Sequence, residues 1–283
     1  MIVSGSASQS LAAALAEQTG EALAAVEFDR FADGELMARV SGFEGERAVV
    51  VAATVTSDAH LELLQLQDAV REAGASEVVT VIPYMGYARQ DRAFRDGEPV
   101  SARAVARAIG TGTDRVLTVD PHEPTVCDWF GVPAEAVAGG PRLAEPLPDS
   151  LSEPLFLSPD EGATDIAEAA RDAYGRGEVD HFEKDRNYDT GAVEISPRDA
   201  AVAGRDVVVT DDIIATGSTM AESVAVLRER GADRVFVACV HPLLAGSART
   251  RLARAGVETV YGTDTIERAV STVSVAPVVA EAL

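Results

Sequence analysis

The sequence predicts an α/β protein made of two similar doubly wound domains. Short runs rich in Val, Ile and Leu alternate with Ala-rich amphipathic segments from one end of the chain to the other. Most of these runs are apolar on both faces, as strands of a parallel sheet covered by helices should be. With 283 residues, 47% of them hydrophobic, the chain is long enough to form two cores.

Each predicted strand is a short β-branched run that ends at turn or polar residues. In chain order the predicted strands are 48–53, 77–82, 115–119, 154–157, 206–210, 234–240 and 257–261. The predicted helices, where apolar residues recur at helical spacing, are 8–17, 58–73, 101–109, 164–174, 218–230 and 246–255. Four prolines interrupt the pattern between residues 139 and 154. The domain boundary is placed there, which gives domains 1–150 and 151–283.

The chain is strongly acidic, with 46 acidic and 24 basic residues and a net charge of -22. This charge makes nucleic acid a poor partner. Only one of the basic residues is a lysine, Lys184. A GC-rich genome would explain the excess of arginine but not the excess of acids, whereas an acidic, lysine-poor surface suits a cytoplasm where salt screens self-repulsion. The composition therefore predicts a halophilic protein that needs salt for its stability.

Other sequence features exclude a membrane protein and a disulfide-rich one. No run reaches the roughly 18 apolar residues that a membrane span needs, and the first residues lack the basic and apolar regions of a signal peptide. Cys127 and Cys239 lie far apart and outside any CxxC pair, so neither a disulfide framework nor a zinc site is indicated. We expect a cytoplasmic protein with no membrane partner.

The predicted strand 206–210 leads into polar residues, at the end of a parallel strand where ligands bind. The first polar residues are Asp211 and Asp212. Two isoleucines later come five small or hydroxyl-bearing residues at the start of the next predicted helix, which we call the phosphate loop: Ala215, Thr216, Gly217, Ser218 and Thr219. Backbone N–H groups at a helix start and three hydroxyls suit a phosphate, and paired carboxylates can accept hydrogen bonds from sugar hydroxyls. A merely capped helix needs one hydroxyl and no acids, so the sequence favours phosphate binding.

Two segments of the predicted first domain carry further candidates. The first contains Phe31, Asp33, Gly34 and Glu35, which by themselves are also compatible with a hairpin turn. The second begins with Arg89 and Gln90 after strand 77–82 and holds five arginines as far as residue 107. Guanidinium groups in such a positive island can hold a polyphosphate. The alternative, a network of arginines and aspartates on a loop, is favoured for Arg92 and Arg95.

Two more strand ends suggest a divalent cation. His122 follows strand 115–119 and stands between Asp120 and Glu123, and Asp160 follows strand 154–157. A histidine beside carboxylates suits a metal ion or phosphate oxygens. Taken singly, such residues also cap strands or form turns.

The segment 211–219 resembles the phosphoribosyl-diphosphate binding motif of the type I phosphoribosyltransferase fold. This leaves two enzyme families open, the phosphoribosyltransferases and the ribose-phosphate pyrophosphokinases. Six motifs within residues 31–219 resemble the second family in their order: F-x-D-G-E, R-Q-D-R, D-x-H, S-P-D-x-G, K-x-R and D-D-I-I-x-T-G-x-T. The resemblance and the charge together indicate a member from a halophilic archaeon, with two type I phosphoribosyltransferase-like domains.

The resemblance implies a role for each motif. ATP would contact Asp33, Gly34, Glu35, Arg89 and Gln90, with Phe31 near the adenine, and Mg2+ would lie near His122 and Asp160. Ribose 5-phosphate would be held by Arg186, Asp211, Asp212 and the phosphate loop, with Lys184 and Arg186 as the catalytic residues. Ala215 and Asp185 depart from the family pattern, which commonly has an acid and a second basic residue there. Lys184 is expected in a loop between two apolar strands, within a flap at 175–191.

The implied reaction is attack by the anomeric hydroxyl of ribose 5-phosphate on the β-phosphorus of MgATP, which gives 5-phosphoribosyl 1-diphosphate and AMP. The resemblance also implies a homo-oligomer, at least a dimer, with an ATP site shared between subunits. Two alternatives stay open. A phosphoribosyltransferase would lack the ATP site, and a catalytically silent regulatory subunit of the same fold would typically have lost Lys184, Arg186 and the aspartates.

Overall fold

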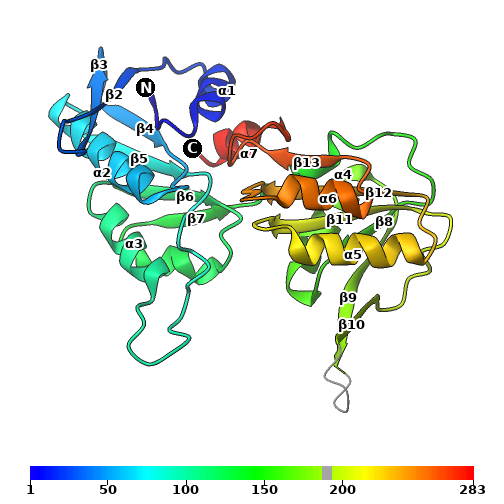
Figure 1. Cartoon of the computed structure of the whole chain (residues 1–283). Helices are drawn as coiled ribbons and strands as arrows, with labels where there is room; N and C mark the ends of the chain where they lie inside the picture. Colours follow the sequence, from blue (N-terminus) through cyan, green and yellow to red (C-terminus); the bar gives the residue numbers. More distant parts are fainter. Residues whose placement is uncertain (187–192) are drawn as a thin grey trace. The chain divides into compact units, whose positions relative to one another are not determined.

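The computed structural model describes residues 1–186 and 193–283, of which 184–186 and 193–195 are described by their backbone alone. The chain divides into two compact units (Figure 1). The first unit comprises Met1–Ala138, Asp264–Glu267 and Ser274–Leu283, and the second comprises Gly139–Thr263 and Arg268–Val273. The break after Ala138 lies at the start of the proline-rich stretch. The units differ from the predicted domains 1–150 and 151–283 because residues 139–150 pack with the second unit and the C-terminal residues return to the first.

The first unit contains a five-stranded parallel sheet of order β1-β4-β5-β6-β7. Its strands are β1 (Ile2–Ser4), β4 (Arg47–Val51), β5 (Glu77–Ile82), β6 (Arg115–Val119) and β7 (Ala134–Val137). Its helices are α1 (Gln9–Thr19), α2 (Ser57–Glu72), α3 (Ser101–Gly110), α7 (Ala276–Ala282) and the 3-10 helix η1 (Pro124–Trp129). A separate antiparallel hairpin joins β2 (Ala25–Arg30) to β3 (Leu36–Ser41).

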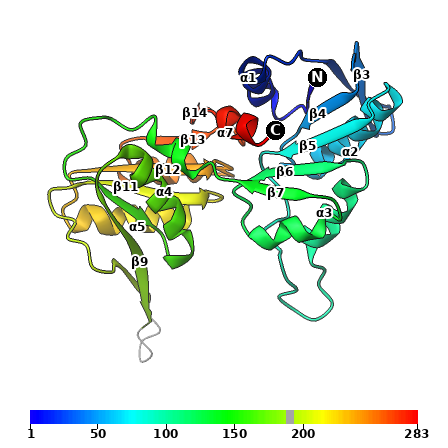
Figure 2. The same cartoon turned by 180° about the vertical axis from the view of Figure 1, so that it is seen from behind.

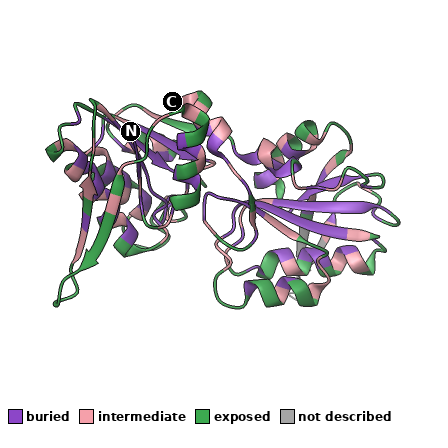
Figure 3. Ribbon diagram, turned by 90° about the horizontal axis from the view of Figure 1, so that it is seen from above, coloured by how far each residue is buried: buried purple, intermediate pink, exposed green. Residues whose placement is uncertain are grey.

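Helices cover both faces of this sheet because alternate strand residues point to opposite sides. Val50, Val78 and Val116 join the core that α2 and α3 close. Val49 and Val79 are equally buried and point to the other side, where α1 and α7 pack against each other. The buried strands of each unit and the exposed outer sides of the helices are visible in Figure 3.

The second unit contains a seven-stranded sheet of order β10-β9-β8-β11-β12-β13-β14, parallel except for the pair β9 and β10. Its strands are β8 (Leu155–Ser158), β9 (Glu178–Arg186), β10 (Val193–Pro197), β11 (Asp206–Ile213), β12 (Arg234–His241), β13 (Val260–Thr263) and β14 (Ser271–Val273). Its helices are α4 (Thr164–Tyr174), α5 (Ser218–Glu229), α6 (Ala248–Ala255) and the 3-10 helices η2 (Gly140–Ala144) and η3 (Glu161–Ala163). Helices α5 and α6 share a core with Val207, Val209 and Val237.

Every predicted strand and helix is present; β5, β6 and α4 have the predicted bounds, and the other elements have one or both ends shifted. The elements missing from the prediction are β1, β7, β14, α7, the three 3-10 helices η1, η2 and η3, and the two hairpins, β2–β3 and β9–β10. They are short, or they lie at the sheet edges and outside the sheets, where the sequence need not be apolar on both faces; β2, for example, is exposed over most of its length. Among the described residues, no helix is both long and apolar enough to cross a membrane.

Candidate active site

The carboxyl ends of β8 and β11 form a switch point in the sheet of the second unit. The chain leaves β8 through α4 and reaches β9 on one side of it, whereas β11 pairs with β8 on the other side. A crevice opens where neighbouring parallel strands lead to opposite sides, and ligands of open α/β sheets bind there. Asp160 follows β8, and Asp211 and Asp212 lie near the end of β11. The strand continues past its predicted end at residue 210, so both aspartates belong to it.

These three carboxylates concentrate negative charge at the switch point. Burial raises the pKa of Asp211, and the neighbouring Asp212 and Asp160 raise it further. Asp211 Oδ1 accepts a hydrogen bond from the Asp212 N–H at 3.0 Å, and Asp160 Oδ1 accepts one from the Gly162 N–H at 3.2 Å. Ionised Asp211 would be stabilised by hydroxyl donors or by a cation. The cluster therefore suits sugar hydroxyls and a divalent cation.

The phosphate loop follows β11, and its last two residues, Ser218 and Thr219, begin α5, whose N-terminus is not capped by a side chain of the described residues. Gly217 precedes the first residue of α5 with a φ of 68°, a conformation that glycine adopts at little cost, and it has no side chain to cap the helix. The other side of this turn is tied down, because the Leu244 and Ala245 N–H groups each donate at 2.8 Å to the carbonyls of Ile214 and Ala215. The N–H groups of the first turn of α5 thus remain to bind an anion.

A charged side chain outside the predicted set also contacts this loop. Arg251 of α6 donates from Nη1 to the Thr216 carbonyl at 2.6 Å and to Ser218 Oγ at 2.7 Å. An arginine in the amphipathic pattern of a later helix carries no sequence signal of such a contact. Only the folded chain brings α6 beside the start of α5.

The structure corrects the predicted environment of Lys184 and Arg186. Both lie on β9 instead of in a loop, and their backbones pair with Ile195 and Val193 of β10. Strand β9 pairs with β8 only as far as His181, so Lys184 and Arg186 lie beyond the carboxyl end of β8, as Asp160 does. Figure 2 shows β9 extending past the rest of the sheet. Of the predicted flap 175–191, residues 187–191 lie outside the described residues.

In the first unit, residues 31–35 form the turn of the β2–β3 hairpin. The Phe31 N–H donates to the Glu35 carbonyl at 2.8 Å, and the Gly34 N–H donates to the Phe31 carbonyl at 2.9 Å. Asp33 Oδ1 accepts from the Glu35 N–H at 3.1 Å, and Gly34 has a φ of 95°. Phe31 is 53% exposed. The hairpin that the sequence allowed is present, and its tip presents an aromatic ring and carboxylates to solvent.

Arg89 and Gln90 lie in the loop that follows β5. Tyr87 takes a φ of 63°, its hydroxyl lies 2.8 Å from Ser57 Oγ of α2, and its carbonyl accepts from the Gln90 N–H at 3.0 Å. Gln90 Oε1 accepts from Ser101 Oγ of α3 at 2.6 Å. The loop is thereby held at the starts of α2 and α3, with Arg89 exposed.

The other arginines of this loop do not form the network that the sequence favoured. The guanidinium of Arg92 lies over the ring of Phe94, 5.3 Å from its centre. Neither Arg92 nor Arg95 forms an ion pair with any residue that the structure describes. These charges are therefore not neutralised within the described part of the chain.

The two residues predicted near Mg2+ belong to different units. His122 follows β6 in the first unit and is exposed, whereas Asp160 follows β8 in the second. Within residues 1–186 and 193–283, no group of three or more His, Cys, Asp or Glu side chains is arranged to hold a metal ion. A cation bound at either residue would therefore need further ligands, such as phosphate oxygens and water.

Two protein-family models match this chain. Residues 1–112 match the model of the N-terminal domain of ribose phosphate pyrophosphokinase. Residues 198–282 match the model of the phosphoribosyl synthetase-associated domain. The two matches cover the hairpin, the Arg89 loop and the phosphate loop.

Individual relatives match the chain over its whole length. The ribose-phosphate pyrophosphokinase of Halobacterium salinarum is 64% identical over 100% of both chains, and that of Methanosarcina mazei is 45% identical over 100% of this chain and 94% of its own. The crystal structure of phosphoribosylpyrophosphate synthetase from Mycobacterium smegmatis is similar with a TM-score of 0.84 and 28% identity, and covers 100% of this chain and 96% of that one. The predicted fold and the halophilic archaeal origin are confirmed. This chain belongs to the ribose-phosphate pyrophosphokinase family.

Proposed function

We propose that this chain transfers the diphosphoryl group of MgATP to the anomeric hydroxyl of ribose 5-phosphate. The products are 5-phosphoribosyl 1-diphosphate and AMP. The observation that carries the proposal is the phosphate loop, which follows two aspartates at the switch point of the second sheet. The identity with relatives of that name over the whole chain supports the same reaction.

Ribose 5-phosphate binds, in this proposal, along the end of β11. The phosphate is held by the phosphate loop (Ala215, Thr216, Gly217, Ser218 and Thr219) and the N-terminus of α5. Asp211 and Asp212 accept hydrogen bonds from the sugar hydroxyls. This arrangement is supported by the raised pKa of Asp211, because hydroxyl donors would stabilise its ionised form.

ATP binds through residues of the first unit. The residues proposed to contact it are Phe31, Asp33, Gly34, Glu35, Arg89 and Gln90. The exposed ring of Phe31 supports adenine binding, because adenine would remove apolar surface from water. The exposed Arg89 supports contact with the triphosphate, since guanidinium groups bind phosphate oxygens in pairs.

The chemical step is an in-line displacement at the β-phosphorus of ATP. The anomeric oxygen forms a bond to that phosphorus, the bond from it to the bridging oxygen of the α-phosphate breaks, and AMP leaves with that oxygen. The proton of the anomeric hydroxyl goes to solvent. The protein contributes mainly positioning and charge stabilisation. Lys184 and Arg186, beyond the carboxyl end of β8, neutralise the charge on the transferring group and on AMP.

Mg2+ fits the residues proposed to approach it. Mg2+ is proposed near Asp160 at the acidic switch point and near His122 after β6; at either residue phosphate oxygens and water would complete its ligands, and it would neutralise phosphate charge. The raised pKa of Asp211 beside Asp160 supports this, because the local excess of negative charge favours a cation.

The active form is proposed to be a homo-oligomer, at least a dimer, in the cytoplasm. Support comes from the tip of the β2–β3 hairpin, where Phe31 is exposed and available to a neighbouring subunit's nucleotide. The substrates, ATP and ribose 5-phosphate, support a cytoplasmic location. A fully active monomer by light scattering under assay conditions would contradict the shared site.

The test of the reaction is the identity of its nucleotide product. The protein is incubated with MgATP and ribose 5-phosphate in concentrated potassium chloride, and the nucleotides are separated by ion-exchange chromatography. We expect AMP in equal amount to 5-phosphoribosyl 1-diphosphate, and none when ribose 5-phosphate is omitted. Formation of ADP, or turnover that requires a nucleobase, would overturn the proposal.

A further inference from the structure

Arg251 lies on α6 and donates hydrogen bonds to two residues of the phosphate loop. One nitrogen of its guanidinium, Nη1, donates both to the Thr216 carbonyl at 2.6 Å and to Ser218 Oγ at 2.7 Å. The two acceptors flank Gly217, whose left-handed backbone makes the turn into α5. Arg251 therefore joins the residues on both sides of this turn through a single group.

These bonds fix the orientation of the groups that would face a phosphate. Because the Thr216 carbonyl points to the guanidinium, the peptide N–H of Gly217 on the other end of the same planar unit points away from it. Because Ser218 Oγ accepts from Arg251, its own hydrogen is left to donate elsewhere. Thr216 Oγ1 lies 3.2 Å from that oxygen and shares the network.

The charge of Arg251 also counters the acidic surroundings of the loop. Asp211 and Asp212 lie just before the loop, and a phosphate would add further negative charge. A guanidinium has five N–H donors, and Nη1 supplies two of them. Nε and Nη2 of Arg251 have no partner among the described residues, so its charge is not neutralised by an ion pair there.

We propose that Arg251 is a positioning residue for ribose 5-phosphate, acting through Thr216 and Ser218 to hold the phosphate loop ready for the phosphate. The inference rests on the proposed function, because it takes the sugar phosphate as the ligand of the loop. It adds a residue of α6 to a site otherwise built by β11 and the start of α5. Loss of this contact should weaken the binding of ribose 5-phosphate and leave ATP binding unchanged.

The test compares two arginines of α6 that differ in this contact. Arg251→Ala removes both hydrogen bonds, whereas Arg249→Ala removes an exposed arginine that makes no hydrogen bond or ion pair with a described residue. Calorimetric titration with ribose 5-phosphate in concentrated potassium chloride should show Kd raised roughly five- to tenfold for Arg251→Ala. The KM for ribose 5-phosphate should rise in parallel, the KM for ATP should stay constant, and kcat should change within about twofold. Arg249→Ala should behave as the wild type.

Further variants separate positioning from a general loss of structure. Arg251→Lys keeps the charge and one donor group and should recover part of the affinity, but not all, because it lacks the planar fork. Combined with Ser218→Ala, Arg251→Ala should add less than its separate effect. Unchanged affinity in Arg251→Ala, strictly additive effects with Ser218→Ala, or equal rises in both KM values would overturn the proposal. A wild type that binds ribose 5-phosphate but forms no AMP would instead refute the proposed reaction.

Discussion

The two ends of strand β11 carry aspartates in opposite electrostatic states. At the amino end, burial alone would raise the pKa of Asp206, but the hydrogen bonds from Arg234 and from the Ser152 N–H outweigh it and lower the pKa. Arg234 donates to both carboxylate oxygens, at 2.9 and 2.5 Å. At the carboxyl end, burial and the neighbouring carboxylates raise the pKa of Asp211. One strand thus holds an acid whose ionised form is stabilised by its partners and, five residues on, an acid whose ionised form is destabilised by burial and by neighbouring carboxylates.

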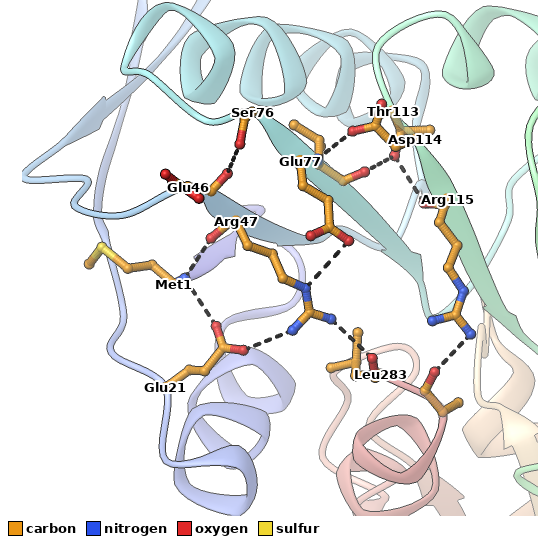
Figure 4. Close-up of polar contacts among 12 residues, drawn as sticks. Met1, Glu21, Glu46, Arg47, Ser76, Glu77, Thr113, Asp114, Arg115 and Leu283 are labelled. Carbon is orange, nitrogen blue, oxygen red and sulfur yellow. Dashed lines mark hydrogen bonds and ion pairs between the residues drawn. The ribbon is translucent and has the colours of Figure 1, made fainter.

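Figure 4 shows the amino ends of the strands in the first unit's sheet, where arginines likewise have hydrogen-bond partners. Arg47, at the start of β4, donates to Glu21 at 3.2 Å and to the carbonyl of Leu283 at 3.1 Å. Arg115, at the start of β6, donates to the carbonyl of Ala282 at 2.8 Å. These bonds attach the C-terminal helix to the strands.

An acid at the same strand ends is stabilised in its charged form. Burial alone would raise the pKa of Asp114, but hydrogen bonds from the Val78 N–H and from Arg71 lower it. The charged residues at the amino ends of the strands therefore stabilise the fold, whereas the carboxylates at the carboxyl ends of β8 and β11 carry negative charge that a ligand would neutralise. Substitutions of acids at the amino and carboxyl ends of the strands should therefore have opposite effects on the stability of the protein.

The largest effect is expected at Lys184, beyond the carboxyl end of β8. If its ammonium acts on charge that develops during transfer, Lys184→Ala should lower kcat by roughly a hundredfold or more, with little change in either KM. Lys184→Arg should recover activity only in part, because the planar guanidinium places its charge differently. Steady-state kinetics in concentrated potassium chloride measure this. Turnover within severalfold of the wild type in Lys184→Ala would return the catalytic role to Arg186.

The second prediction concerns Asp211, where we expect a substitution to raise the stability of the folded protein, whereas most substitutions of buried residues lower it. Asp211→Asn removes one charge from the acidic cluster, so it should raise the melting temperature of the ligand-free protein while lowering activity by at least tenfold. Differential scanning calorimetry without Mg2+ measures the first effect, and the AMP assay measures the second. A lower melting temperature would show that the carboxylates do not repel one another in the folded state.

The matched variant at the other end of the same strand is Asp206→Asn. It should lower the free energy of unfolding by about 2 kcal/mol, because a buried acceptor loses its charge-assisted bonds to Arg234. Turnover at saturating substrate should stay within twofold. Urea unfolding in constant salt gives the stability. If Asp206→Asn lowers activity as strongly as Asp211→Asn does, the proposed division between a stabilising amino end and a functional carboxyl end of β11 is wrong.

The smallest predicted effect is a pH dependence from His60, in the first turn of α2. Both ring nitrogens are buried without a hydrogen-bond partner among the described residues, and burial lowers its pKa from 6.5 to about 4. Between these values the unfolded chain binds a proton that the folded chain does not, so stability falls as the pH falls through this window. His60→Leu should remove this component, worth on the order of 1–2 kcal/mol after allowance for partial exposure. Parallel unfolding curves at pH 7 and pH 4.5 measure it, and an unchanged difference between them would refute it.

Local patterns in the sequence account for much of the fold and for one whole part of the site. The central strands are continuous β-branched runs, so their positions follow from the local sequence pattern alone. The phosphate loop is contiguous, and a strand, two acids, hydroxyls and a helix start suffice to identify it. The strand containing Lys184 was missed because β9 extends beyond the covered sheet, where no apolar run marks it.

The sequence by itself determined the α/β class, the acidic halophilic character and the kinds of residue at each strand end, since all of these depend on composition or on neighbours along the chain. The tertiary structure decided which strand ends meet. Strand order places Asp160 beside Asp211, and packing brings Arg251 to the phosphate loop, although more than thirty residues separate them. It also returned the C-terminal helix to the first unit. Such contacts form between segments whose local patterns are independent of each other, so only the burial of the shared core selects them.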